Sequence, residues 1–93
     1  MKKYKLKSND ITEYNFDENG IVIYDNKSEY THFLNDSATF LFNILKEKDL
    51  SIDDIRDRFI KEYDIDDFEK LNTDLLIIIC LFIDKNLVEV YEV

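Results

Sequence analysis

The spacing of apolar residues changes once along this chain, near Leu34, and this change limits the folds that the chain can adopt. Before Leu34 apolar and polar residues alternate with a period of two, which is typical of half-buried strands. After it the apolar residues recur with a period of about 3.6, which is typical of helices. A run of strands followed by a run of helices predicts an α+β fold.

The first part of the chain predicts a three-stranded antiparallel meander. Its strands are expected at Ile11–Phe16, Ile21–Tyr24 and Glu29–Leu34, all rich in β-branched and aromatic residues. Asn19-Gly20 predicts a hairpin turn, because both residues tolerate a positive φ. Asp25-Asn26-Lys27-Ser28 predicts a second turn, because aspartate, asparagine and serine favour turns.

The second part predicts three helices, each preceded by a residue that can cap its first turn. The second and third helices are separated only by a short break at Asp64-Ile65, which is a helix-turn-helix arrangement. The third is expected to run to about Asn86, and Leu87–Tyr91 alternates like a short closing strand or an extended wing. The candidate caps are Asn35 or Asp36, Ser51, and Asp66 or Asp67.

The chain has 93 residues, which predicts a single domain. We assign residues 11–93 to it and treat residues 1–10 as a basic N-terminal arm, either a frayed strand or a tail. The arm carries four lysines in its first nine residues and no acid there. The charge of +4 on residues 1–9 leaves −13 on the rest of a chain whose net charge is −9.

This charge distribution and the composition exclude several classes of function. An acidic body repels the phosphate backbone, so nucleic acid is not an expected partner. The longest apolar run, Leu75–Ile83, is shorter than the roughly 20 residues that span a membrane. Cys80 is the only cysteine, which fits a cytoplasmic protein without an internal disulfide.

The passage from the third expected strand into the first helix resembles the corresponding junction in the PqqD family, where a strand ends in Leu-Asn and an apolar helix follows. The resemblance extends over roughly residues 11–90. One position departs from the family pattern: Asn86 stands where the family usually has glycine, and asparagine also tolerates a left-handed cap. The matching positions are Leu34-Asn35, Ala38, Ser51–Ile55, Tyr63, Asp74-Leu75 and Leu87-Val88.

The resemblance implies a winged helix-turn-helix-like domain that acts as a free-standing recognition element for ribosomally synthesised, post-translationally modified peptides. Such a domain binds the leader segment of a precursor peptide as an added antiparallel strand on the third strand, in a groove against the third helix. A partner enzyme, such as a radical-SAM maturase or a lasso-type leader protease, then modifies the peptide. The binding residues implied in this way are Glu29, Tyr30, Thr31, His32, Phe33, Leu34, Leu71, Asp74, Leu75, Ile78 and Phe82.

The residues themselves give two reasons to expect such a groove. The third strand lacks the proline and lysine residues that usually protect a sheet edge. The third helix is apolar on all sides over Leu75–Ile83, so it is either enclosed between the sheet and the other helices or lines a groove or protein interface with one flank. By the family pattern, Leu75, Ile78, Ile79 and Phe82 face the core, and Leu76, Ile77, Cys80 and Ile83 cover another surface.

The single residues with chemical potential are assigned mostly structural roles. His32 is expected to pack or to contact the peptide, and Cys80 to be a small core residue. Asp74 either caps or bridges locally or meets the leader peptide. Of Tyr30 and Phe33, which alternate across the strand, one is expected in the core and the other exposed or in the groove.

We therefore expect no enzyme activity, no catalytic residue, no metal and no cofactor, and a monomer or weak homodimer. Two other functions are weighed against peptide binding. The first is a homodimeric or adaptor module that uses the apolar third helix. The second is a winged-helix DNA-binding regulator, which the scarcity of basic residues on that helix disfavours, since Lys70 and Lys85 are its only cations.

Overall fold

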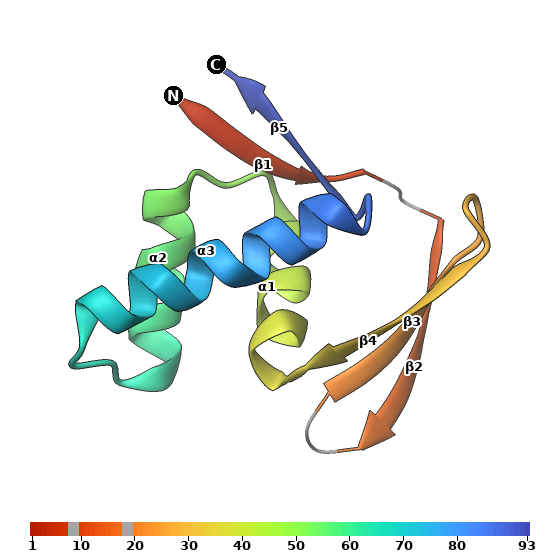
Figure 1. The fold of residues 1–93 in the computed structure, drawn as a ribbon, viewed down its shortest axis with the longest axis horizontal. Helices are drawn as coiled ribbons and strands as arrows, with labels where there is room; N and C mark the ends of the chain where they lie inside the picture. Colours follow the sequence, from red (N-terminus) through yellow and green to blue (C-terminus); the bar gives the residue numbers. More distant parts are fainter. Residues whose placement is uncertain (8–9, 18–19) are drawn as a thin grey trace.

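The computed structural model describes residues 1–7, 10–17 and 20–93, the side chains of residues 15–17 excepted. Its elements follow the predicted order of strands and then helices, with one more strand at the N-terminus (Figure 1). The predicted α+β class, with a three-stranded meander, three helices and a closing strand, is confirmed. The elements are β1 (Lys2–Leu6), β2 (Ile11–Asp17), β3 (Gly20–Asp25), β4 (Tyr30–Asn35), α1 (Asp36–Glu47), α2 (Ile52–Tyr63), α3 (Phe68–Asp84) and β5 (Val88–Glu92).

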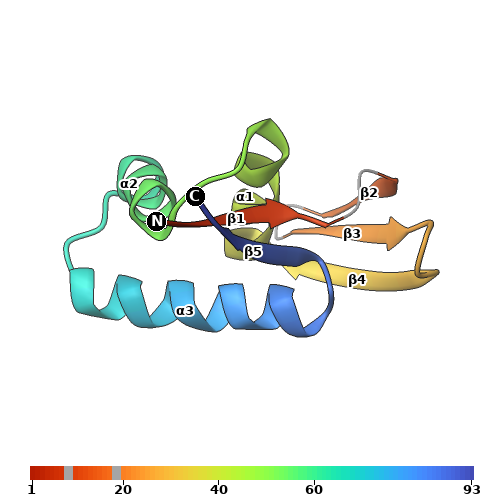
Figure 2. The same cartoon turned by 90° about the horizontal axis from the view of Figure 1, so that it is seen from above.

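The strands form two separate antiparallel sheets. The larger sheet has the order β2-β3-β4, so β2 and β4 are its edges, and the smaller pairs β1 with β5. Figure 1 shows the larger sheet on one side of the molecule and the helices on the other, with α1 next to β4. Seen from above, α3 lies along one face of the molecule, beneath α1, α2 and the small sheet (Figure 2).

Residues 1–7 belong to the folded body rather than to a solvated tail. Lys2 pairs with Glu92 and Leu6 with Val88 across the small sheet. Tyr4 also exchanges two backbone hydrogen bonds with Leu50, with N···O distances of 2.8 and 3.1 Å. The segment folds onto the body because apolar and charged residues alternate along it. Tyr4 and Leu6 pack against the core, while Lys5 between them stays exposed.

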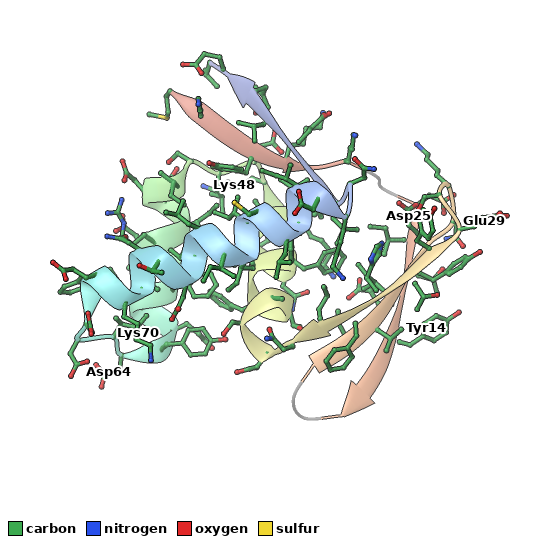
Figure 3. All side chains as sticks on the ribbon, viewed as in Figure 1. Tyr14, Asp25, Glu29, Lys48, Asp64 and Lys70 are labelled. Carbon is green, nitrogen blue, oxygen red and sulfur yellow. The ribbon has the colours of Figure 1, made fainter. Side chains whose placement is uncertain are left out.

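Two positions expected in or next to the turns differ from the sequence prediction. Glu29, expected on the third strand, has φ 64° and lies in the turn before β4. Figure 3 shows Glu29 at the outer end of the β3–β4 hairpin. Gly20 opens β3 without a positive φ. Its partner in the expected turn, Asn19, lies outside the described residues.

Each helix is capped by one of the predicted residues. Asn35, Ser51 and Asp67 lie at the N-caps of α1, α2 and α3, and each side chain accepts a hydrogen bond from a backbone N–H three residues on. Such caps satisfy amide donors that the first turn leaves unpaired. At the helix ends Asp64 and Asn86 adopt left-handed φ values of 50° and 59°, as the sequence predicts for Asn86.

The core lies between the large sheet, the three helices and the small sheet. Its strand residues alternate as predicted, with Ile21 and Ile23 buried on β3 and Leu34 on β4. Among the described helices, none combines the length and apolar character needed to cross a membrane. The remaining buried apolar residues are Leu41, Phe42, Ile44, Leu45, Leu50, Ile55, Phe59, Leu71, Leu75, Ile79, Phe82, Leu87 and Val88.

Candidate functional site

The outer edge of β4 is the first component of the candidate site. β4 pairs with β3 along its whole length, from Tyr30 opposite Asp25 to Asn35 opposite Gly20. In the described part of the chain no strand pairs with its other side. In an antiparallel ladder every second residue turns its N–H and C=O groups away from the partner strand. The outer edge of β4 therefore presents a row of backbone donors and acceptors.

An apolar groove lies beside this edge, between β4 and the C-terminal half of α3. The hollow has a volume of about 290 Å³. Phe33 stands at its rim with 52 % of its surface exposed, whereas its neighbour Leu34 is buried at 2 %. The lining residues are Phe33, Leu34, Asn35, Ala38, Ile78, Leu81, Phe82 and Lys85.

Hydrogen bonds at both ends fix the walls of the groove. On the β4 side, Asn35 Oδ1 accepts from the N–H of Ala38 at 3.0 Å, and the hydroxyl of Thr39 donates to the carbonyl of Leu34 at 3.1 Å. On the α3 side, the N–H of Leu87 donates to the carbonyl of Phe82 at 2.9 Å as the chain leaves the helix. Both walls of the groove therefore end at hydrogen-bonded helix termini.

Four of the predicted site residues meet in this groove: Phe33, Leu34, Ile78 and Phe82. Tyr30 and Thr31 are exposed further along β4. The expectation that one of Tyr30 and Phe33 is a core residue is wrong, because both are more than half exposed. Tyr30 lies on the same side of β4 as the buried residues His32 and Leu34, but it is exposed because it is the first residue of the strand.

The other predicted site residues lie elsewhere. Leu71 and Leu75 are buried in the core. Asp74 is exposed and lines a different hollow, together with residues of the α2–α3 connection such as Asp64 and Ile65. These three residues precede the groove on α3 by one or two helical turns, because only the C-terminal half of the helix approaches β4.

Four residues that line the groove were not among the binding residues expected from the sequence: Asn35, Ala38, Leu81 and Lys85. The spacing of Ile78, Leu81, Phe82 and Lys85 is i, i+3, i+4 and i+7, which is the pattern of one helix face. The sequence contains that pattern. However, all residues from Leu75 to Ile83 are apolar, so the sequence does not show which of them share the face that lines the groove.

His32 points into the protein from β4 and is 8 % exposed. Its Nε2 atom is buried without a hydrogen-bond partner in the described part of the structure. Burial, and to a smaller extent the positive charge of Lys85, hold the pKa of this imidazole below its ordinary value of 6.5, while the Asp25 carboxylate acts in the opposite direction. His32 therefore contributes to the inner side of the strand as a neutral packing residue.

The other edge of the sheet, β2, adjoins a surface of different character. A hollow of about 420 Å³ lies among β1, β2 and α1. Charged side chains dominate its lining, and two of them, Lys46 and Glu13, form an ion pair at 2.7 Å. Desolvating such charges costs free energy, so this edge is a poorer receptor for apolar side chains than the edge of β4.

Within the described residues no three His, Cys, Asp or Glu side chains come together in a way that could hold a metal ion. The chain matches no protein-family model, no curated protein and no solved structure.

Proposed function

We propose that this protein binds the leader segment of a ribosomally synthesised precursor peptide, as an antiparallel strand added to the outer edge of β4. A single juxtaposition carries the proposal: the edge of β4 that no described strand covers lies directly beside an apolar groove. In such complexes backbone hydrogen bonds provide affinity, and alternate side chains of the peptide enter pockets that provide specificity.

The groove favours one large or two small apolar side chains of the peptide. Its volume of about 290 Å³ is at the lower end of the range for small-molecule sites. Phe33, Ile78 and Leu81 offer apolar contacts, and Lys85 adds a cation at one end. We expect a peptide with an apolar anchor, a carboxylate near Lys85, and roughly micromolar affinity.

In this proposal the protein carries out no reaction and uses no cofactor. It holds the peptide in the cytoplasm while a separate enzyme, such as a radical-SAM maturase or a leader protease, acts on the part that extends beyond the groove. The resemblance to the PqqD family supports this role, and the groove supports its binding mode.

The test is a titration of the isotopically labelled protein with the leader peptide of a precursor encoded beside its gene, followed by amide chemical shifts. We expect the shifts to concentrate on Tyr30–Asn35 and Ile78–Lys85, and the outward amides of β4 to become protected from hydrogen exchange. Shifts that map to β2, or no shifts at peptide concentrations of about 1 mM, would exclude strand addition at β4.

A further inference from the structure

The side of α3 that faces away from the core is apolar and uncovered. We name this side the outer face; its apolar residues are Leu76, Ile77, Cys80, Leu81 and Ile83. Leu76 and Ile77 are 56 % and 55 % exposed. Figure 2 shows α3 along one face of the molecule. The other helices and the small sheet all lie on the side of α3 that is opposite to the outer face. The expectation that this helix is enclosed between the sheet and the other helices is therefore wrong. The expected core position of Cys80 is also wrong, because Cys80 is exposed.

The core does not require the apolar residues of the outer face. Leu71, Leu75, Ile79 and Phe82 already form the buried stripe of α3. A surface helix with one buried stripe normally carries polar residues on the opposite side. Exposed apolar residues that gather on one face are typical of an interaction site.

A shallow hollow of about 390 Å³ lies on the outer face, with Thr73 and Cys80 among its lining residues. The bulkier side chains Leu76, Ile77 and Leu81 line it as well. Small side chains along the middle of a helix face, with larger ones on either side, leave a shallow depression into which the side chains of another helix can pack. The shape therefore fits a helix as its occupant.

On the line of the helix that passes through Ile77, opposite charges lie at the two ends of the outer face, and the exposed acids Glu69 and Asp74 flank the positive one. Lys70 is exposed near the start of α3 (Figure 3), and Asp84 is exposed at its end. They are about four turns, or about 21 Å, apart along the helix, so they project from nearly the same side. Ile77 stands midway between them. If two copies of α3 pack antiparallel about Ile77, Lys70 of each copy faces Asp84 of the other; parallel packing would place like charges together.

We propose that the outer face pairs with the outer face of a second copy of this chain, as an antiparallel two-fold dimer centred near Ile77. A two-fold interface uses the same patch on both copies, so an antiparallel arrangement forms the Lys70–Asp84 contact twice. The contact is about one helix long and falls at the small end of the range for specific interfaces, so the association is weak.

The net charge of −9 on each copy sets the salt dependence of this dimer. Two acidic bodies repel each other, and salt screens that repulsion while leaving apolar contacts intact. Dimerisation should therefore strengthen as salt is raised. A basic partner held by the same face would show the opposite dependence, because salt weakens attraction between opposite charges.

The experiment is sedimentation analysis of the full chain between about 1 µM and about 1 mM, the range expected for weak interfaces. The average mass of the unchanged protein should rise with concentration. Ile77→Glu should raise the dimer dissociation constant by about 30-fold or more, because it places a charge at the centre of the apolar contact. Val90→Glu changes an exposed apolar residue of β5 and is the matched control, which should dimerise normally.

A charge exchange tests the orientation of the two helices. Lys70→Asp and Asp84→Lys should each weaken the dimer by about fivefold, since each places like charges opposite one another. The double variant should restore the original dissociation constant. A monomer at every concentration, or an undiminished dimer with Ile77→Glu, would overturn the proposal, and failure of the double variant to recover would overturn the antiparallel arrangement.

This inference does not depend on the proposed peptide binding, although Leu81 lines both the groove and the hollow of the outer face. Phe33→Glu alters the groove alone and should leave the dimer intact. Ile77→Glu should leave peptide binding intact. Each proposal can therefore fail without the other.

Discussion

Gly20 faces the end of β4 so closely that a Cβ atom at this position would collide with the carbonyl oxygen of Leu34. The residue directly opposite Gly20 in the β3–β4 pairing is Asn35, the N-cap of α1. The chain has no other glycine. This one lets β3 approach the backbone of β4 at the point where the strand turns into the helix and the groove begins.

Replacing Gly20 with alanine should therefore destabilise the protein by about 2–3 kcal/mol, because the backbone at Leu34 must move to make room. The measurement is the urea midpoint at an unchanged slope. Thr31→Ala, on the exposed side of β4, is the control and should stay within about 0.5 kcal/mol. Equal stability of the two variants would mean that β4 does not approach Gly20 as closely as described.

Phe33→Glu should weaken leader-peptide binding by about tenfold or more, since it removes an apolar wall of the groove and introduces a charge. Tyr14→Glu is the matched control: Tyr14 is a similarly exposed aromatic residue on the other edge strand of the same sheet (Figure 3). Titration calorimetry on both variants separates the edges. A loss of affinity with Tyr14→Glu and none with Phe33→Glu would assign the peptide to β2.

The stability of the protein should fall as the pH is lowered through the range in which His32 protonates. The folded-state pKa of His32 lies below its ordinary value of 6.5, so between these two values the unfolded chain binds more protons than the folded one. Stability is then complete above pH 6.5 and decreases below it. Urea midpoints at pH 7.5 and 5.5 should differ more in the unchanged protein than in His32→Leu, which lacks the titrating group.

A second measurement tests the cause of this shift. Lys85→Met removes the positive charge that helps to lower the pKa of His32. In an NMR titration of the imidazole, the pKa should move upward in this variant but remain below 6.5, since burial is the larger cause. An imidazole that titrates at 6.5 in the unchanged protein would show that His32 is not buried as described.

Leu6→Ala should destabilise the protein by about 1–2 kcal/mol, because the side chain packs partly against the core from β1. Lys5→Ala, one residue earlier, is the control. It removes an exposed ion pair with Glu89 whose N···O distance is 3.9 Å, and such pairs contribute little. If both variants were as stable as the unchanged protein, residues 1–7 would be a dispensable arm after all.

Local rules predicted the elements of this fold well. The alternation of the strands, the caps Asn35, Ser51 and Asp67, and the left-handed Asn86 all follow from interactions within a few residues, which a sequence displays directly. The pairing of β1 with β5 joins residues almost the whole chain apart. Nothing in the local pattern of Lys2–Leu6 identifies that partner.

The candidate site was predictable only in part for a related reason. Phe33, Leu34, Ile78 and Phe82 were expected at the groove and line it. The position along α3 at which β4 approaches depends on the three-dimensional path of the chain, so Leu71, Asp74 and Leu75 were placed in the groove although they lie outside it. The uncovered outer face was also not predictable, since an all-round apolar helix fits a buried position equally well.

The pairing of β1 with β5 also determines how the protein would respond to a mechanical load. Met1 and Val93 lie side by side, and the N–H of Val93 donates to the carbonyl of Met1 at 2.8 Å. A force that separates the two ends therefore loads this outermost bond first and opens the ladder one pair at a time, from Lys2–Glu92 towards Leu6–Val88. We expect the small sheet to unzip at low force, while the β2-β3-β4 sheet and the groove, which lie behind it in the load path, remain folded.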